Sequence, residues 1–417
     1  MRSAAKLGTR VVVAATIATT ATLAIATTAT RASGAARVEA FTHAGAPAFA
    51  GDGGPARAAT LASPAGVAVD TAGDVAIADT GNCRVRYVPA TPGRRYGVEM
   101  RSGDIYTIAG STCGYSGDSG RATSARLSFP TDVAFDAAGN VFVSDTGNNE
   151  IRMISPAGEI SSAAGSGTQG FSGDHGLSTA AALNGPSGIT VDPAGDLYIA
   201  DTNNCRVREV PTRNGITALA PIAGDISTVA GDGTCGDAGA GGAATHAELF
   251  TPDDVALDAR GDLFVADTGN RVVREVAASA GTNFGIAMTP GRIYTVAGSG
   301  TYNPYFGDGL AAVGDASSLS YPTGIALDAA GDLFVADTYA RGVREIPAAA
   351  GAAFGTVMQP DTLYTLAGAG RGETPTAGGT AHDPVVYPSR IALSASGTVF
   401  VADIGNNRVE LLRSPPG

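Results

Sequence analysis

A segment of 23 residues recurs along most of the chain, and this repetition limits the possible folds more than any other feature. It first occurs as PAGVAVDTAGDVAIADTGNCRVR at residues 64–86 and last as PSRIALSASGTVFVADIGNNRVE at residues 388–410. The six copies have their cores near residues 64–88, 130–154, 186–210, 252–276, 322–346 and 388–412. A fixed period of this kind predicts one structural unit that is repeated six times.

Each copy has the pattern of three strands joined by two tight turns. The apolar run at residues 67–69 ends in the sequence DTAG, in which Asp suits the first position of a turn and Gly suits the left-handed one. A second run covers residues 75–78, and a third begins near Cys83. Most copies continue to a fourth strand, such as IYTIAG at residues 105–110. Four strands per unit, repeated around an axis, predict the blades of a β-propeller.

The sixth copy lacks its fourth strand, because the chain ends at LLRSPPG. The sequence VEAFTHAG at residues 38–45 matches the fourth strand of the other copies and is followed by a similar glycine-rich linker. We therefore predict an all-β fold: a single six-bladed β-propeller of four-stranded blades, closed by the N-terminal strand, which completes blade six. The 58 glycines and the low share of charged residues, 16%, fit a chain of short apolar strands and tight turns.

Residues 1–36 are predicted to be a secretory signal peptide, which leaves residues 37–417 as the propeller domain. The segment starts with basic residues, continues with an apolar run from Val11 and ends in small residues. An uncleaved membrane anchor is the alternative, but the run is rich in threonine. We expect a secreted protein, extracellular or associated with the cell envelope, with no membrane span after the signal is removed.

The charge of the chain argues against two classes of partner. The net charge is −12, and no lysine follows Lys6. Binding to nucleic acid or to anionic membranes would need basic stripes, which the sequence lacks. We expect a monomer whose partner is an extracellular protein or glycan.

The repeats and their linkers, of the form AGxxxxxxxGDGGPAxxAxLxxP, resemble NHL-repeat β-propellers, especially secreted bacterial NHL-repeat proteins and the NHL domain of teneurins. The resemblance covers about residues 38–412 and implies the propeller fold. For function it implies a protein-binding platform, although a few relatives are lyases or lactonases. The propeller lyase that cleaves amidated peptide precursors holds zinc with histidines of its central cavity. None of the four histidines of this chain can be matched to those ligands: His43, His175, His246 and His382.

An aspartate ends the second strand of every blade. A catalytic acid is needed once, whereas a turn carboxylate is needed in every blade, so we interpret these residues as structural acceptors of backbone N–H groups in the loop to strand three. The six are Asp79, Asp145, Asp201, Asp267, Asp337 and Asp403. By the same logic five framework arginines should pair with carboxylates: Arg86, Arg152, Arg208, Arg274 and Arg344, with Glu410 at this position in blade six. No catalytic residue is assigned.

The four cysteines form two pairs with the same spacing. Cys83 and Cys113 are thirty residues apart, as are Cys205 and Cys235. Each pair places one cysteine at the start of strand three and the other just past strand four, where adjacent antiparallel strands bring them together. An oxidising compartment and an even count predict two disulfides, Cys83–Cys113 and Cys205–Cys235. A zinc site is disfavoured because the pairs lie in non-adjacent blades without a neighbouring histidine.

The Gly-Asp linkers offer oxygen ligands at similar positions, at Asp52, Asp118, Asp174 and Asp308, with a looser match at Asp237. They carry neither the Lys-Ser/Thr of a phosphate-binding loop nor the spacing of an EF-hand. Calcium on this acidic surface is one interpretation, and aspartate-stabilised loops with a short helical turn are the other. We expect no further cofactor, and the sequence leaves open whether any metal binds.

Three charged residues break the pattern of the inner strands. These strands begin Pro-x-Gly in blades one, three and five, but the glycine is replaced in the other blades by Asp132, Asp254 and Arg390. Alternate blades of a six-fold ring are separated by a third of a turn, so the three charges could converge at one mouth of the channel and bind a small ligand or cation. The alternative is a set of solvated rim charges in which Arg390 neutralises an aspartate.

From these patterns we predict a secreted, non-enzymatic scaffold that binds a protein or glycan. One alternative is an enzyme of the lyase or lactonase kind with a metal in the channel, and another is a calcium-stabilised cell-surface scaffold. Inserts between strands three and four, which should extend the outer hairpins, carry Tyr96, Phe284 and Phe354. These aromatic residues either contact a partner or pack onto their own blades.

Overall fold

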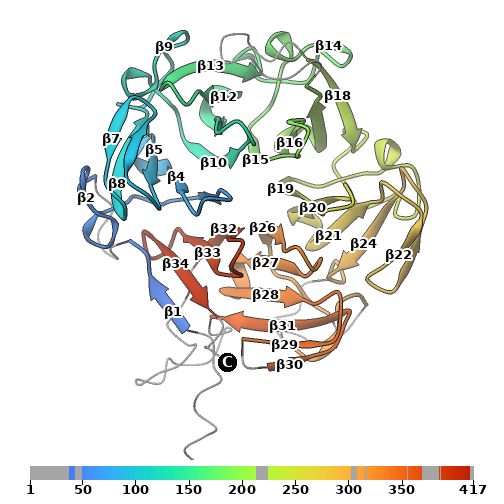
Figure 1. Cartoon of the computed structure of the whole chain (residues 1–417). Helices are drawn as coiled ribbons and strands as arrows, with labels where there is room; N and C mark the ends of the chain where they lie inside the picture. The colour runs from blue at the N-terminus through green and yellow to red at the C-terminus, as the bar shows by residue number, and fades with distance from the viewer. Residues whose placement is uncertain are drawn as a thin grey trace, which may run out of the picture.

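A computed structural model of the chain describes residues 37–42, 49–212, 224–301, 308–314, 317–354, 356–368, 385 and 387–413. Six small antiparallel sheets stand around a central axis, each with its first strand innermost (Figure 1). The predicted six-bladed β-propeller is confirmed.

The four main strands of each blade follow the repeat. From the centre outward they are β3 (Gly66–Val69), β4 (Val75–Asp79), β5 (Arg84–Val88) and β8 (Asp104–Ala109) in blade one; β10 (Pro130–Phe135), β11 (Val141–Asp145), β12 (Glu150–Ile154) and β13 (Glu159–Ala164) in blade two; and β15 (Pro186–Val191), β16 (Leu197–Asp201), β17 (Arg206–Val210) and β18 (Asp225–Ala230) in blade three. They continue as β19 (Pro252–Leu257), β20 (Leu263–Asp267), β21 (Val272–Val276) and β24 (Ile293–Ala297) in blade four, and as β26 (Pro322–Leu327), β27 (Leu333–Asp337), β28 (Gly342–Ile346) and β31 (Thr362–Ala367) in blade five.

Blade six closes the ring with both ends of the chain. It contains β32 (Pro388–Leu393), β33 (Val399–Asp403) and β34 (Arg408–Arg413), and its outermost strand is β1 (Arg37–Ala40). β1 runs antiparallel to β34, with Val38 opposite Leu412. The predicted closure by the N-terminal strand is therefore confirmed.

The linkers run along the outer edge of the blades. Short strands of the linkers pair with the outermost strand of the blade that follows: β2 (Gly54–Pro55), β9 (Gly120–Arg121), β14 (Gly176–Leu177) and β25 (Leu310–Ala311). After β2 the chain forms the predicted helical turn, a 3₁₀ turn at Ala56–Ala58 that follows Pro55. The inserts of blades one, four and five form extra hairpins: β6 (Gly93–Arg95) with β7 (Val98–Met100), β22 (Gly281–Asn283) with β23 (Ile286–Met288), and β29 (Gly351–Ala353) with β30 (Thr356–Met358).

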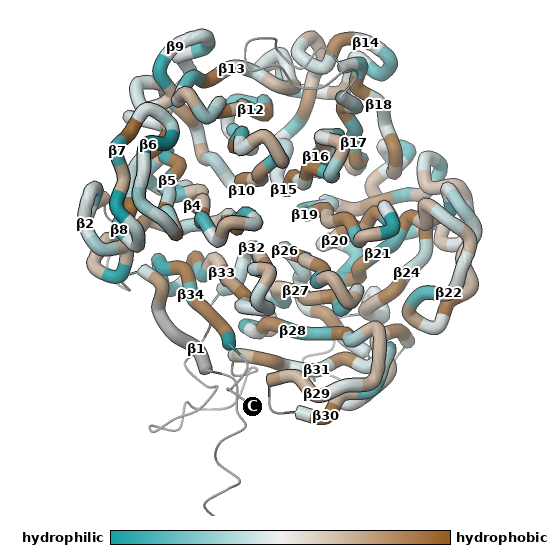
Figure 2. Tube along the Cα trace, viewed as in Figure 1, coloured by the Kyte–Doolittle hydropathy of each residue, from teal (hydrophilic) through white to brown (hydrophobic). Residues whose placement is uncertain are grey.

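The hydrophobic core lies between neighbouring blades rather than inside one layer. One cluster of buried side chains, for example, joins Ala76 and Tyr87 of blade one to Val133 and Val143 of blade two. This follows from the alternation of side chains along a strand, which gives each blade two apolar faces. In Figure 2, hydrophobic segments follow many of the blade strands, while the linker strand β9 at the rim is more hydrophilic.

The predicted signal peptide, residues 1–36, lies outside the described residues and stays a prediction. His43 and His382 also lie outside the described residues. Across the residues that the structure describes, helices are too short or too polar to cross a membrane.

Candidate functional site

The repeated aspartates are buried anchors of the blade loops. Oδ1 of Asp79 accepts a hydrogen bond from the backbone N–H of Ala62 at 2.7 Å, and Oδ2 accepts one from Nδ2 of Asn82 at 2.8 Å. The equivalent carboxylates accept backbone N–H groups from Ser128, Asn184, Phe250, Ser320 and Tyr387. Each aspartate thus holds the linker that enters the inner strand.

This geometry differs in one detail from the expected role. We expected backbone donors in the loop to strand three, and such donors are seen at Asp403, from Gly405 and Asn406 at 3.1 and 3.3 Å. The donor common to all six carboxylates is instead the linker residue 16 or 17 positions earlier. Burial raises the pKa of Asp145 to about 6 and that of Asp337 to about 6.

The five framework arginines join each repeated aspartate to the linker of the same blade. Arg86 is fully buried, with its Nη1 3.4 Å from Oδ2 of Asp79 and its Nη2 2.8 Å from Oδ1 of Asp52. The same bridge recurs between Arg152 and Asp118, Arg208 and Asp174, and Arg344 and Asp308. In blade four Arg274 instead donates to the backbone carbonyl of Asp237 at 3.1 Å.

The linker aspartates are therefore partners of buried guanidinium groups. Among the described residues, no group of three His, Cys, Asp or Glu side chains is arranged to hold a metal ion. The carboxylate at the arginine position of blade six, Glu410, pairs with Arg408, whose Nη2 lies 2.6 Å from its Oε1. Both observations describe a structural network.

In blades one, two, four and five the threonine that follows the repeated aspartate joins neighbouring blades. Oγ1 of Thr80 in blade one donates to the carbonyl oxygen of Pro130 in blade two at 2.6 Å. The same bond links Thr146 to Pro186 and Thr338 to Pro388, each at 2.7 Å. The Asp-Thr pair of the repeat therefore serves the assembly of the ring.

Both predicted disulfides are confirmed. The Cα atoms are 5.2 Å apart in Cys83–Cys113 and 5.4 Å apart in Cys205–Cys235. Cys83 and Cys205 both adopt the left-handed conformation, with φ of 52°. Each bridge ties the start of strand three to the chain that leaves strand four.

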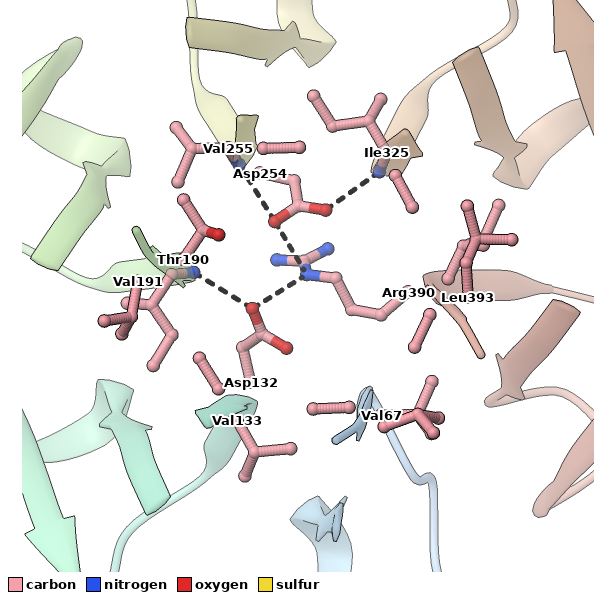
Figure 3. Close-up of a pocket in the computed structure, with 18 of the residues that line it drawn as sticks. Val67, Asp132, Val133, Thr190, Val191, Asp254, Val255, Ile325, Arg390 and Leu393 are labelled. Carbon is pink, nitrogen blue, oxygen red and sulfur yellow. Dashed lines mark hydrogen bonds and ion pairs between the residues drawn. The ribbon is translucent and has the colours of Figure 1, made fainter. Parts of the chain in front are cut away.

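The structure brings Asp132, Asp254 and Arg390 together at one end of the channel, as Figure 3 shows. Nε of Arg390 lies 3.7 Å from Oδ2 of Asp132 and 3.5 Å from Oδ1 of Asp254. All three residues are at most 4% exposed. The alternative of solvated rim charges is wrong for this reason, whereas the ion pairing of Arg390 with aspartates is present. A ligand-binding role for the three stays a prediction.

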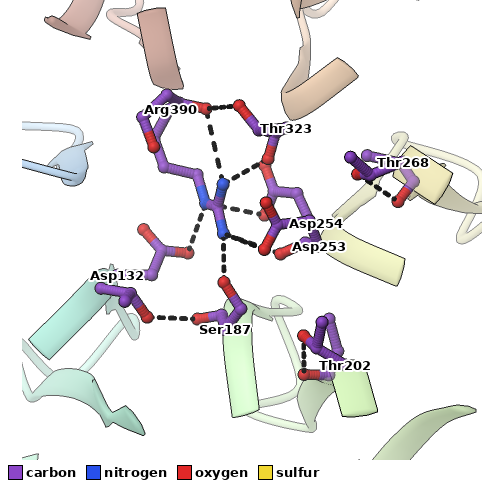
Figure 4. Close-up of polar contacts among 12 residues, drawn as sticks. Asp132, Ser187, Thr202, Asp253, Asp254, Thr268, Thr323 and Arg390 are labelled. Carbon is purple, nitrogen blue, oxygen red and sulfur yellow. Dashed lines mark hydrogen bonds and ion pairs between the residues drawn. The ribbon is translucent and has the colours of Figure 1, made fainter. Parts of the chain in front are cut away.

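The other donors of Arg390 point to different groups (Figure 4). Nη2 donates to Oγ of Ser187 at 2.8 Å and to the backbone carbonyl of Asp253 at 2.7 Å. Nη1 donates to the carbonyl oxygen of Thr323. The guanidinium of blade six thus reaches the inner strands of blades three, four and five.

Each of the two aspartates accepts a hydrogen bond from a backbone N–H group of the next blade. Oδ2 of Asp132 accepts the N–H of Ile189 at 2.9 Å, and Oδ2 of Asp254 accepts the N–H of Ile325 at 2.8 Å. Ile189 lies at the end of a register shift in the pairing of its inner strand, and Ile325 lies one residue beyond such a shift. Burial raises the pKa of Asp132 to about 6 and that of Asp254 to about 8, although Arg390 opposes both shifts.

The central channel forms a cavity of about 220 Å³, and the charged cluster is part of its lining. All six inner strands line it with small and aliphatic side chains, and Thr190 is the single other polar residue among those lining it in the described chain. Burial decreases along each strand, from the charged level to a level of half-buried side chains at the other end: Val69, Phe135, Val191, Leu257, Leu327 and Leu393. The cavity is therefore closed by Arg390 and its aspartates and opens at the opposite mouth.

A second candidate site is an exposed aromatic patch over blades five and six, which the sequence analysis did not identify. The rings of Tyr321 and Tyr339 are stacked, with centroids 4.6 Å apart. The guanidinium of Arg341 lies over the ring of Tyr387 at 5.4 Å. Tyr339 is 46% exposed and Tyr387 is 37% exposed. We name these four residues the tyrosine patch.

One sequence signal could have revealed this patch. Blade five reads DTYAR where blades one, two and four read DTGN, so Tyr339 and Ala340 replace a Gly-Asn pair. Without the asparagine, Oδ2 of Asp337 accepts no hydrogen bond from any described residue and lies 3.7 Å from Nη1 of Arg344. Blade five therefore lacks the hydrogen bond that an asparagine donates to the repeated aspartate in other blades, and it exposes an aromatic ring at this position.

The hairpin aromatics pack onto their own blades. Tyr96, Phe284 and Phe354 are at most 8% exposed. Their rings make edge contacts with Tyr87, Phe264 and Phe334, at centroid distances of 5.1, 5.9 and 6.5 Å. A direct role in partner contact is therefore wrong for these three. Of the two described histidines, His175 lies 3.3 Å from Oγ of Ser227, away from the channel.

Comparison with known proteins agrees with this architecture. The model of the NHL repeat matches residues 61–86, 127–152 and 183–209. Teneurin-3 of Mus musculus is 31% identical over 231 residues, which are 52% of this chain and 8% of that protein, so the chain spans about a twelfth of this relative's length.

Two solved structures share the fold at 13% identity. One is an auxiliary nutrient binding protein from Bacteroides thetaiotaomicron, with a TM-score of 0.56 over 91% of this chain and 77% of that one. The other is a gluconolactonase from Xanthomonas campestris, with a TM-score of 0.51 over 91% and 90%. The two solved structures show the fold, and the repeat matches together with the teneurin relative support an NHL-repeat β-propeller family for this chain.

Proposed function

We propose that this propeller is a secreted, non-enzymatic scaffold that binds an extracellular protein or glycan through the tyrosine patch. Secretion is supported by the predicted signal peptide and by the two disulfides, since disulfides persist in oxidising compartments. The fold itself does not choose the function, because a gluconolactonase and a nutrient-binding protein share it.

The observation that carries the proposal is the exposure of Tyr339 at a position where sibling blades have glycine. Gly81, Gly147 and Gly269 fit closely against the linker at this position, and a Cβ on Gly81 would lie 2.9 Å from the carbonyl oxygen of Ala62. Blade five places a large ring there and stacks it on Tyr321. A pair of aromatic rings exposed to solvent is unfavourable in free energy, whereas burying the same rings under a partner is favourable.

The composition of the patch favours a protein partner over a glycan. Tyrosine and arginine are the residues most enriched at the energetic centres of protein interfaces, and this patch contains three tyrosines and an arginine. Phe129, 62% exposed, and Phe250, 44% exposed, occupy equivalent positions before the inner strands of blades two and four.

The proposal is tested by giving blade five the Gly-Asn pair that blades one, two and four have at this position. Wild-type protein is immobilised and used to capture partners from the envelope and medium of the producing organism, and each captured protein is purified and titrated. The double variant Tyr339→Gly/Ala340→Asn should bind it at least about tenfold more weakly, since central interface tyrosines contribute this much. Val357→Ser, which removes a 75% exposed apolar residue from the outer hairpin, should bind normally.

Other outcomes would reject the proposal or change the class of partner. Equal binding by wild type and the double variant would reject the patch, and binding to a glycan array without any captured protein would reassign the partner class. The enzyme alternative predicts a metal in the purified protein, which elemental analysis detects, and turnover of small esters or lactones. The calcium-stabilised scaffold predicts a lower melting temperature after chelation.

A further inference from the structure

The cavity beneath Arg390 has too little positive charge for its carboxylates. Asp132 and Asp254 are both buried, and Nε of Arg390 faces both of them at 3.5 to 3.7 Å, beyond hydrogen-bonding distance. The hydrogen bonds made by its Nη atoms go to carbonyl and hydroxyl oxygens of Thr323, Ser389, Ser187 and Asp253. Nη2 also lies 3.5 Å from Oδ1 of Asp253, so the two buried carboxylates share one guanidinium with a third carboxylate.

The two carboxylates keep acceptor capacity for a ligand. Both accept hydrogen bonds from backbone N–H groups, Asp132 from Ile189 and Asp254 from Val255 and Ile325. Two carboxylates offer about eight lone-pair directions, so these bonds leave several unused. Both carboxylates belong to the lining of the cavity.

The open mouth of the cavity has the same sign of charge. The turns that follow the six inner strands contain nine aspartates and one arginine: Asp70, Asp74, Asp136, Asp192, Asp196, Asp258, Arg260, Asp262, Asp328 and Asp332. Arg260 pairs with both aspartates of its own turn, and Arg95 from the neighbouring hairpin pairs with Asp74. A narrow opening surrounded by one sign of charge and low-dielectric walls attracts and concentrates cations.

We propose that the central cavity binds a small primary ammonium ligand, with the ammonium group at Asp132 and Asp254 and an aliphatic body along the channel wall. This site is separate from the tyrosine patch: its charged end lies near the start of the inner strands, and its mouth opens at their other end. An ammonium group supplies three N–H donors and the missing positive charge. The aliphatic levels of the wall, such as Leu257, Leu327 and Leu393, receive the apolar body.

Other cations fit this cavity less well. A quaternary ammonium group has no N–H to donate and is held by aromatic cages, whereas Phe135 is the single aromatic residue among those lining the cavity in the described chain. A divalent metal needs more oxygen ligands than two carboxylates and an apolar wall provide. The volume of about 220 Å³ is below that of sites for drug-sized ligands, roughly 300 to 1,000 Å³, and suits a metabolite-sized amine.

The site should release a proton on binding. Burial raises the pKa of Asp254, the guanidinium of Arg390 opposes this shift, and the neighbouring Asp132 adds to it. An ammonium group at the two carboxylates favours their charged forms, so affinity for an amine should rise with pH over the range in which a primary amine stays protonated.

The test is calorimetric titration of the full chain with n-hexylammonium chloride. We expect saturable binding, an increase in affinity with pH, and no comparable binding of 1-hexanol, which has the same apolar body without the charge. Asp254→Asn should weaken binding by about tenfold or more, because hydrogen bonds to charged groups are worth this much. Glu99→Gln, which removes an exposed charge from a hairpin outside the cavity, should bind as wild type does.

A second variant separates loss of the site from loss of the fold. Ala326→Leu narrows the apolar wall and leaves both aspartates in place, so it should also weaken hexylammonium binding. The proposal is overturned if the amine does not bind at all, if 1-hexanol binds equally well, or if folded Asp254→Asn and Ala326→Leu both bind like wild type.

Discussion

Gly188 of blade three lies against Asp254 of blade four so closely that a Cβ on Gly188 would be 2.6 Å from the Cα of Asp254. Gly66 has the same relationship with Asp132, and Gly324 with Arg390, at 2.6 and 2.8 Å. The alternation of glycine and charged residues around the channel therefore has a steric cause. Each odd-numbered blade leaves the space that the charged residue of the next blade occupies.

Adding a single methyl group should disturb this arrangement. Gly188→Ala forces Asp254 or its backbone to move, and overpacking of this kind costs roughly 1 to 3 kcal/mol in the free energy of unfolding. Urea denaturation measures the loss. Gly281→Ala is the matched control, because a Cβ on Gly281 would meet no atom within 4 Å. Equal stability of the two variants would show that the inner strands can separate without cost.

The fold could be predicted from the sequence because it depends on features that repeat. The six copies give the number of blades, and the unmatched strand near Val38 indicates how the ring closes. The disulfides also follow, since Cys83 and Cys113 flank neighbouring antiparallel strands. Each inference needed only topology, and no side-chain geometry.

The candidate sites depend on contacts between blades that the repeat does not encode. The sequence places Asp132, Asp254 and Arg390 at one level of the channel, but whether water reaches them depends on how Arg390 packs. Its donors reach Ser187 and the carbonyl of Asp253, which are 203 and 137 positions away in the chain. The stacking of Tyr321 on Tyr339 likewise joins a linker to a loop between strands.

Buried carboxyl groups should make the protein less stable as pH rises. Glu345 is 1% exposed, and burial, followed by repulsion from Asp332 and Asp328, raises its pKa from 4.5 to about 8. A carboxyl group whose pKa is higher in the folded state binds more protons there than in the unfolded chain. Its cost is absent below about pH 4.5 and grows until about pH 8, by at most about 1.4 kcal/mol per pH unit.

Glu345→Gln should reduce this dependence. We expect the free energy of unfolding to fall less steeply between about pH 5 and pH 8 in the variant than in wild type, as measured by urea denaturation across that range. Blade four provides a control, because the equivalent Glu275 accepts two hydrogen bonds from Nδ2 of Asn283, where blade five has Ala353. Ala353→Asn should therefore also stabilise the protein near pH 8. Identical pH profiles for all three proteins would contradict the assignment.

Loss of one disulfide should lower the stability substantially. Cys83 has a left-handed backbone, and blade two has Asn149 in the same conformation, so Cys83→Asn with Cys113→Ser removes the bridge without new backbone strain. Opening a loop of 30 residues should cost about 2 to 4 kcal/mol in the free energy of unfolding. Removal of Cys205–Cys235 should have a similar effect, since the two bridges occupy equivalent positions. A loss below about 1 kcal/mol would mean that the linkers already hold these strand ends.

The tyrosine patch predicts a conflict between stability and binding in blade five. Ala340→Asn supplies the amide donor that Asp145 receives from Asn148 at 2.8 Å, so it should stabilise the protein by about 1 kcal/mol. The reciprocal change in blade two, Asn148→Ala, breaks bonds to Asp145 and to the carbonyl of Gly114 and should cost at least as much.

These two variants separate the framework from the patch. Ala340→Asn alone keeps Tyr339. A gain in stability with unchanged partner binding would show that the alanine contributes neither to the stability of the fold nor to binding by the tyrosine patch. If Ala340→Asn both stabilises the protein and weakens binding, the missing hydrogen bond lets Tyr339 adopt the position in which it stacks on Tyr321. No gain in stability, measured beside a clear loss in Asn148→Ala, would contradict the view that Asp337 lacks only this donor.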